Sequence, residues 1–369
     1  MVMTSRERLT RLFNNEEIDR IPIWLLNPVH RLGCYTDFFN NPVYQDVAGY
    51  VNRYADNLDR RSYSFGHFRN GNPDIVTERI REGDNRNGRS GTRIRYKDFV
   101  LESYIETVNG QRHKKYYLDD IDQLEQILEI PYIEKNPDIS SYRREKEELG
   151  ERGLMMSDIG DPLAVLYSLM DAADFSIATL TDYDKLLTFT DEMYRRVLKN
   201  YKYLLENDIG EVFFIVGAEF AGPPLVSPDK FNALSVRYVK GIVDLIREYG
   251  KKSIVHYHGN LYHVLKGMKE INPDGLHTIE APPIGDCTIA QAREVLGNMI
   301  LIGNLQYDDL RSMSADEIDG AVKNMIEEAK GGRFILSTTA GPYENHPSQA
   351  ILDNYIQFIK SGVKYGSKK

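Results

Sequence analysis

Short apolar segments alternate with amphipathic helical patterns through most of this 369-residue chain. The alternation is clearest in the second half, where helical periodicity separates one β-branched run from the next. Repeated strand–helix units imply a parallel sheet, and seven or eight of them suit a closed (β/α)8 TIM barrel better than an open sheet. We expect strands at 21–25, 154–157, 211–216, 253–258, 275–280, 299–303 and 333–337, and helices at 163–170, 183–206, 228–249, 288–296 and 314–330.

One segment interrupts the alternation. Between residues 91 and 118 the pattern changes to period two, with many Tyr, Thr and charged residues. Asn109 and Gly110 supply the turn sequence that β-hairpins favour. We therefore expect a β-hairpin insertion near 91–118 in the N-terminal part of a single barrel domain that spans residues 1–369.

Composition excludes several classes of protein. The formal net charge of −9 argues against nucleic acid as the main partner. No run of about 18 apolar residues could span a membrane, and the first residues lack the apolar core of a signal peptide. Two cysteines, Cys34 and Cys287, are too few for a disulfide framework. We expect a cytoplasmic enzyme.

Two histidines at the end of one expected strand are the most informative candidates for chemistry. His256 and His258 close the apolar run 253–258. Alternate side chains of a strand share a face, so both imidazoles should emerge together at the C-terminal end, where parallel α/β folds place their sites. The pair suits half of a metal site or an acid–base pair. The plainer alternative is a histidine that only hydrogen-bonds inside the barrel mouth.

Two carboxylates complete the expected catalytic set with His258. Glu280 ends the expected strand 275–280, where it can ligate a metal, hold a substrate cation or act as a general base. Glu219 follows the strand 211–216 among glycines that allow close approach to a ligand. The alternatives are a buried salt bridge for Glu280 and a helix-capping carboxylate for Glu219.

Three further residues are expected to contact substrate. Asp158 ends a strand, although its Asp-x-Gly sequence also suits an ordinary turn. Asn304 follows a strand and can donate to a substrate oxygen. Arg69 stands in an aromatic segment whose members are candidates for the rim of a planar-substrate site, although aromatic loops often serve only packing: Tyr63, Phe65, Phe68 and Arg69.

Two other reactive side chains are set aside. His277 lies an odd number of residues from Glu280, so strand alternation places it toward the helices. Cys287 stands at a helix start, which lowers a thiol pKa and permits a nucleophile. A plain loop cysteine is the favoured interpretation of Cys287.

Several motifs together resemble one known superfamily. They are segments 5–9 and 19–24, the loop 221–228 followed by Phe231, the pair Gly303 and Asn304, and segment 334–345. This combination resembles the uroporphyrinogen decarboxylase superfamily, whose (β/α)8 barrels include the decarboxylase and cobamide-dependent methyltransferases. The end of the insertion, 117–122, looks more like the methyltransferase-type members.

Departures from the decarboxylase pattern argue against that reaction. Members that decarboxylate uroporphyrinogen carry an arginine-rich segment soon after the first strand, to hold several carboxylates. This chain has only His30 and Arg31 there. Thr339 and Ala340 occupy the place of the decarboxylase's histidine on the eighth strand.

The resemblance also implies a metal. Thiol-activating methyltransferases of the superfamily bind zinc through His-x-Cys and a later Cys, where this chain has His256-x-His258 and Ala340. A site for zinc or another divalent metal would then use His256, His258 and Glu280, with Glu219 as the next candidate donor. Harder metals, or no metal, stay open.

The function implied is methyl transfer between a small methylated ether, thioether or amine and a corrinoid. No Asp-x-His-x-x-Gly cobalamin segment is present, so the corrinoid would be carried by a separate partner protein. A metal or an acid at His258 and Glu280 would activate the heteroatom. The alternatives are a decarboxylase of uroporphyrinogen or another acid, and a non-catalytic ligand-binding barrel. A homodimer is compatible with all three.

Overall fold

A central ring of parallel strands organises the molecule. The computed structural model describes residues 2–33, 35–84 and 86–367, and within them eight parallel strands follow the order β1-β12-β11-β10-β9-β8-β7-β2. The (β/α)8 prediction is confirmed. Cys34 lies outside the described residues. The strands are β1 (Ile23–Trp24), β2 (Asn57–Ser62), β7 (Gly153–Asp158), β8 (Val212–Val216), β9 (Lys252–Tyr257), β10 (Gly275–Thr278), β11 (Ile300–Leu305) and β12 (Phe334–Thr338).

Strand β2 is the barrel strand that the sequence did not predict. Its sequence includes Asp59, Arg60 and Arg61, which are atypical of a buried strand. Each of these charges has a specific partner in the fold. The Asp59 carboxylate, for example, accepts from the Val29 amide at 2.5 Å and from His30 Nδ1 at 2.6 Å.

One aspartate joins the two end strands of the sheet and completes the ring. The Asp56 amide donates to the Ile23 carbonyl at 2.7 Å, and the Ile23 amide donates to Asp56 Oδ2 at 2.9 Å. The same carboxylate accepts from Arg8 Nη1 at 2.6 Å and from Arg20 Nη1 at 2.8 Å. Backbone and ionic bonds therefore meet at the junction of β1 and β2.

Strand alternation divides the apolar side chains into two cores. Residues such as Met156, Phe214 and Ile302 fill the barrel interior, while their neighbours face the surrounding helices. Helix α1 (Ser5–Phe13) packs Leu12 and Phe13 into the interior cluster. This helix therefore belongs to the inner core and not to the outer layer.

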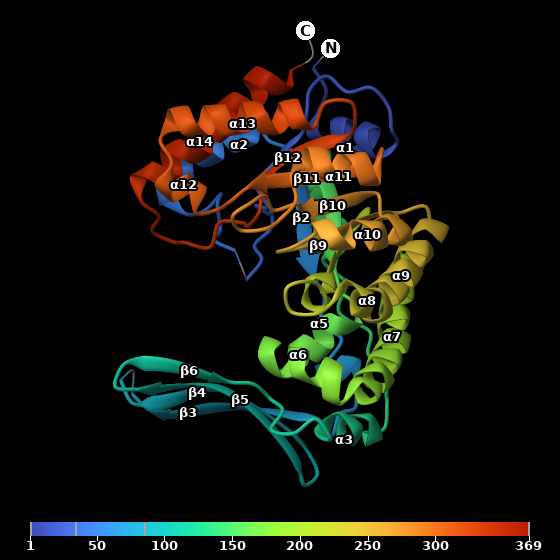
Figure 1. Cartoon of the computed structure of the whole chain (residues 1–369). Helices are drawn as coiled ribbons and strands as arrows, with labels where there is room; N and C mark the ends of the chain where they lie inside the picture. The colour runs from blue at the N-terminus through green and yellow to red at the C-terminus, as the bar shows by residue number, and fades with distance from the viewer. Residues whose placement is uncertain (1, 34, 85, 368–369) are drawn as a thin grey trace.

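Helices connect the strands and cover the outside of the barrel (Figure 1). The long helix α7 matches its predicted limits, and α5, α11 and α13 agree with theirs to within a few residues, while the predicted helix 228–249 corresponds to α8 and α9 together. The sequence did not predict the remaining helices. The helices are α2 (Gln45–Tyr54), α3 (Gln123–Glu129), α4 (Tyr142–Leu149), α5 (Pro162–Tyr167), α6 (Ala172–Thr181), α7 (Tyr183–Glu206), α8 (Pro228–Phe231), α9 (Arg237–Glu248), α10 (Leu265–Ile271), α11 (Ile289–Leu296), α12 (Asp309–Ser312), α13 (Ala315–Glu328) and α14 (Gln349–Gly366).

The insertion is larger than predicted. The Asn109–Gly110 turn joins β5 (Phe99–Val108) to β6 (Gln111–Lys115), so the predicted hairpin is confirmed. In the described part of the chain, β3 (Val76–Gly83) and β4 (Gly88–Tyr96) extend it to an antiparallel sheet of four strands. Strand β3 is mostly charged and exposed, and Ile80 is its buried apolar residue. Its sequence therefore lacks the apolar alternation that predicts a strand. Figure 1 shows this sheet projecting away from the barrel.

No helix in the described ranges combines the length and apolarity that crossing a bilayer requires.

The Asp56 junction should dominate the stability of the barrel. We expect Asp56→Asn to lower the free energy of unfolding by about 3 kcal/mol, because it removes the negative charge between the buried Arg8 and the partly buried Arg20. Urea denaturation measures this loss. The matched control is Glu7→Gln, which breaks the exposed Glu7–Arg11 pair and should change stability by about 0.5 kcal/mol or less. Equal effects of the two substitutions would contradict the role of Asp56.

Candidate functional site

Aromatic side chains form the floor of the barrel mouth. Trp24 at the end of β1 lies 5.6 Å from the His277 ring, between centroids, and Phe214 of β8 lies 5.0 Å from the His256 ring. Both histidines are buried, at 0% and 9% exposure respectively. The apolar interior of the barrel therefore ends in a layer where two imidazoles meet two aromatic rings.

The prediction that His277 faces the helices is wrong. His277 is the register partner of His256 in the parallel pair β9–β10, and their rings stack with centroids 4.9 Å apart. Alternation fails as a guide because β10 ends at Thr278 and Ile279 takes a left-handed backbone conformation, with φ of 58°. A β-branched residue rarely adopts that conformation. The turn brings both His277 and Glu280 to the mouth.

Hydrogen bonds fix the tautomers of the two buried histidines. His277 Nε2 lies 3.0 Å from the Thr338 carbonyl oxygen, which can only accept, so this nitrogen carries the proton. The neutral His277 ring then presents a lone pair at Nδ1, 2.7 Å from His256 Nδ1. His256 must donate across that contact. Its own Nε2 therefore bears the lone pair, available to a proton donor or a metal.

Both rings are neutral because they are buried. Burial lowers the pKa of His277 to about 3, although the hydrogen bond to Thr338 opposes the shift. Burial also lowers the pKa of His256 well below its ordinary value, and the neighbouring histidines and Arg60 add to the effect. The tautomer assignment consequently holds at neutral pH.

His258 and Glu280 form an ion pair above this layer. His258 Nδ1 lies 3.1 Å from Glu280 Oε1, and the His258 and His256 rings are 4.5 Å apart between centroids. The Gly259 amide donates to Glu280 Oε2 at 2.6 Å, and Gln306 Nε2 donates to Oε1 at 3.2 Å. The side chain of His258 is 41% exposed, whereas that of Glu280 is 6% exposed. The pair therefore presents His258 to the solvent side of the mouth.

The two partners shift each other's pKa in opposite directions. Burial alone would lower the pKa of His258, but the hydrogen bond and charge of Glu280 raise it above the ordinary value. Burial alone would raise the pKa of Glu280, but His258 and the Gly259 amide lower it. The ion pair is therefore favoured at neutral pH. We call His256, His258, His277 and Glu280 the mouth cluster.

Two polar residues at the end of β11 support Glu280, one through its carboxylate and one through the turn before it. Gln306 accepts from Thr339 Oγ1 at 2.9 Å while it donates to Glu280, so its amide orientation is fixed. Asn304, predicted to contact substrate, donates from Nδ2 to the Ile279 carbonyl at 2.7 Å. Asn304 thus supports the left-handed turn before Glu280, and its contact with substrate stays a prediction.

Asp158, the second residue predicted to contact substrate, forms an ion pair with an arginine. Arg60 of β2 donates to Asp158 Oδ2 from Nε at 2.9 Å and from Nη2 at 2.5 Å. Arg60 also donates to Tyr35 Oη at 2.6 Å and lies 4.9 Å from the centre of the Phe214 ring. Asp158 therefore orients Arg60 at the mouth in this structure.

Glu219 lies in the short helix Ala218–Ala221 that follows β8, the strand next to β9 in the barrel. Its Oε2 accepts from the Gly217 amide at 3.1 Å. Burial raises the pKa of Glu219, with contributions from Glu280, while the charge of His258 opposes the shift. Glu219 is thus within electrostatic reach of the ion pair, and its predicted catalytic role stays open.

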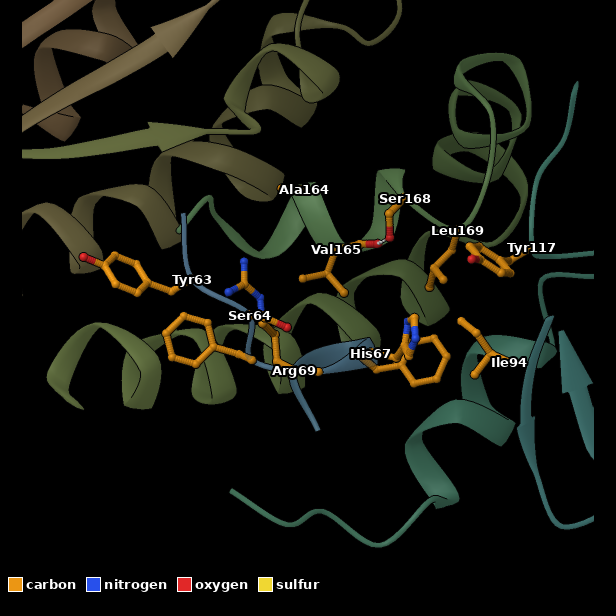
Figure 2. A pocket seen from close by; sticks show the side chains of 13 residues that line it. Tyr63, Ser64, His67, Arg69, Ile94, Tyr117, Ala164, Val165, Ser168 and Leu169 are labelled. Atoms are coloured by element: carbon orange, nitrogen blue, oxygen red, sulfur yellow. Dashed lines mark hydrogen bonds between the residues drawn. The ribbon is translucent and has the colours of Figure 1, made fainter. Parts of the chain in front are cut away.

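A cavity of about 400 Å³ lies on the C-terminal side of the barrel, between the loop after β2, helix α5 and the inserted sheet. We call it the side pocket. Figure 2 shows Arg69 reaching from the loop toward α5, with Ile94 and Tyr117 at the other end. The predicted aromatic and basic rim is brought together here, since the lining includes Tyr63, Phe65, Phe68 and Arg69.

The predicted metal ligands do not form a three-donor site in this arrangement. His258 Nδ1 and Glu280 Oε1 are hydrogen-bonded to each other, and His256 Nδ1 is committed to His277. Across residues 2–33, 35–84 and 86–367, no group of three His, Cys, Asp or Glu side chains is arranged to hold a metal ion. Zinc at His256, His258 and Glu280 therefore stays a prediction without geometric support.

Cys287 has no sign of activation. It is fully buried, and burial raises the pKa of its thiol to about 12. This environment agrees with the favoured interpretation of a plain loop cysteine.

His277, Gln306 and Arg60 are site residues that sequence reasoning missed. His277 aligns with His256 once the two strands are set in register. Gln306 follows Asn304 by two residues, the spacing that shares a strand face. Arg60 lies in β2, which was not predicted as a strand because its sequence is charged.

Burial of a neutral His277 should make the fold sensitive to acid. Its folded pKa of about 3 lies below the ordinary 6.5, so the unfolded chain takes up the proton first as pH falls. Stability should therefore decrease below pH 6.5, by about 1.4 kcal/mol per pH unit from this residue. The slope of the unfolding free energy between about pH 6 and 4 measures it.

Substitution of His277 tests whether this residue causes the pH dependence of stability. His277→Gln should flatten that slope by about the same 1.4 kcal/mol per pH unit, while His263→Gln, at an exposed position, should leave the slope unchanged. A His277→Gln variant with the parent slope would show that His277 is not a buried neutral group.

The chain is similar to known proteins in both sequence and structure. A family model described as uroporphyrinogen decarboxylase (URO-D) matches residues 105–355. A methyltransferase from Methanosarcina mazei has a similar structure, with a TM-score of 0.62 at 16% identity over 98% of this chain and 99% of that chain. A B12-independent methionine synthase from Shewanella sp. W3-18-1 gives 0.49 at 8% identity over 94% and 97%. No curated protein sequence matches significantly. At such identities the structural likeness concerns the fold.

Proposed function

The chain belongs to the uroporphyrinogen decarboxylase family, and from that premise we propose that it is a methyltransferase acting between a small methylated substrate and a corrinoid on a partner protein. The observation that carries the proposal is the His258–Glu280 ion pair at the barrel mouth. It offers an acid to the leaving heteroatom of an ether, thioether or amine. The M. mazei protein of similar fold is itself described as a methyltransferase.

The ion pair has the properties that a general acid needs. Protonated His258 keeps the proton at Nδ1 directed at Glu280, which leaves the proton at Nε2 for the substrate. When the bond between methyl carbon and heteroatom breaks, the heteroatom keeps the electron pair and takes that proton. His258 is left as the neutral imidazole, still oriented by Glu280. The reverse reaction uses the same residue as a base.

The second histidine offers an acceptor beside this donor. His256 Nε2 bears a lone pair because His277 and the Thr338 carbonyl fix the tautomers. It is suited to accept a hydrogen bond from a hydroxyl, ammonium or thiol group of the substrate. The donor on His258 would bind the leaving heteroatom, and the acceptor on His256 would bind a neighbouring hydroxyl, ammonium or thiol group of the same substrate.

A bound corrinoid supplies the methyl-accepting cobalt, and this chain's part is to leave access to the site. The 41% exposure of the His258 side chain is compatible with approach of a partner-held group. The donors present do not converge as a three-ligand site among the described residues, so the acid in this proposal is the side chain of His258.

Turnover and its pH dependence test the acid. In a screen of methyl ethers, thioethers and amines with cob(I)alamin as acceptor, formation of methylcobalamin is followed by absorbance. We expect His258→Gln to slow turnover about 100- to 10,000-fold, and His263→Gln, at an exposed position, to leave it unchanged. Activity should fall as pH rises through the raised pKa of His258.

Glu280→Gln distinguishes acid catalysis from simple packing. Loss of the negative charge lowers the pKa of His258, so the high-pH limit of activity should move to lower pH. Turnover that loses nothing in His258→Gln, or a high-pH limit that does not move in Glu280→Gln, would reject His258 as the acid.

Decarboxylation of uroporphyrinogen is the second candidate, because the family carries that description. The residues after β1 do not favour it. His30 is bonded to Asp59 at 2.6 Å and to Glu148 at 3.2 Å, and Arg31 is exposed. Neither forms a clamp for several carboxylates.

Uroporphyrinogen turnover should accordingly be absent or very slow. Each missing charge-assisted contact costs about 1.5–3 kcal/mol, so three of them amount to more than about a thousandfold in transition-state binding. Coproporphyrinogen formation by the purified protein measures this activity. Efficient formation would make the decarboxylase the leading answer.

A further inference from the structure

The guanidinium of Arg69 enters the side pocket without a matched negative charge. Its Nη2 donates to the Ile159 carbonyl, and its Cζ lies 5.5 Å from the centre of the Phe65 ring. Among the residues that the structure describes, no carboxylate comes within ion-pair distance of Arg69. A partly buried cation with only a carbonyl and a ring as neighbours favours an anionic partner.

The nearest acids do not supply that charge. Asp158 is already paired with Arg60 at 2.5 Å. Burial raises the pKa of Asp161 to about 8, against the hydrogen bond from the Ala164 amide and the charge of Arg69, so burial disfavours its ionised form. Its Oδ2 is buried and has no hydrogen-bond partner within the described ranges. The phenol of Tyr201 is neutral, since burial raises its pKa.

A second cation adds to the positive potential. Lys135 lies close to the loop at Gly66, and its charge contributes, after burial, to the lowered pKa of His67. His67 is consequently neutral, with Nε2 2.7 Å from Thr77 Oγ1 of β3. Two cations, Arg69 in the side pocket and Lys135 beside its loop, therefore lie at this end, and Asp158, whose charge reaches Arg69, is already paired with Arg60.

The remaining walls combine apolar side chains with hydroxyl and imidazole groups, since Ser64, His67, Tyr117 and Ser168 also line the pocket. Phe65 and Phe68 come from the loop, Val165 and Leu169 from the α5 side, and Ile94 from β4 of the insertion. The volume of about 400 Å³ falls within the range of small-molecule sites. The insertion thus contributes a wall that a barrel without it would lack.

We propose that the side pocket binds a compact organic anion, with a carboxylate on the Arg69 guanidinium and a flat apolar body between the aromatic loop and Ile94. An arginine fork matches the two oxygens of a carboxylate, and aromatic walls suit a planar body. The proposal concerns binding, and it stands whether or not methyl transfer is the reaction.

A pair of isosteric probes tests it. Isothermal titration compares 2-naphthoate with 2-naphthamide, which differ in charge and hardly in shape. We expect the full-length protein to bind the carboxylate at least about tenfold more tightly, the contribution of one charge-assisted contact. Arg69→Gln should remove the difference. The control Arg79→Gln, an exposed arginine of β3, should keep it.

Two other variants locate the binding. Val165→Phe fills the side pocket and should weaken both probes about tenfold or more, with circular dichroism reporting that the fold is kept. Should Arg69→Gln fail to fold, Arg69→Lys keeps the charge and should bind naphthoate with intermediate affinity. Absence of naphthoate binding, equal affinity for the two probes, or a preference that survives both Arg69→Gln and Val165→Phe would overturn the proposal.

Discussion

Asp56 joins the first and last strands of the sheet, and the placement of the other strand ends depends on that junction. Strand β1 is only two residues long, so ladder bonds alone give it little hold. The Asp56 backbone and carboxylate form hydrogen bonds with Ile23. The same carboxylate accepts from Arg8 of helix α1. A ring closed in this way fixes which strands are neighbours and at what register. The aromatic floor at Trp24 then meets β8 and β10.

Register then determines the chemistry of the mouth. Pairing of His256 with His277 across β9 and β10 brings their Nδ1 atoms together, and the proton between them must belong to His256. The Thr338 carbonyl thus fixes the tautomer of His277, and His277 fixes that of His256, which leaves the lone pair of His256 on Nε2. His258, one residue beyond the strand, is less buried than the other two histidines, and the hydrogen bond and charge of Glu280 outweigh its burial and favour its charged form.

The sequence predicted the barrel because periodicity is a local property, and each apolar run carries it independently. It predicted that His256, His258 and Glu280 would share one end of the barrel for the same reason. Strand β2 and His277 were not predictable in that way. The charges of β2 are satisfied only by residues distant in the chain, such as Asp158, and the inward turn of Glu280 depends on Ile279 leaving the strand conformation. Both effects belong to tertiary structure.

The left-handed backbone at Ile279 has a consequence for laboratory evolution. Such a conformation costs roughly 1–2 kcal/mol for a residue with a side chain. It is retained by the packing of the Ile279 side chain in the outer core and by Asn304 on its carbonyl. Substitutions in the surrounding helices can therefore relax this turn and displace Glu280 without touching the mouth. Selection for thermostability alone would favour such changes, and a catalyst engineered from this scaffold should be screened for turnover and stability together.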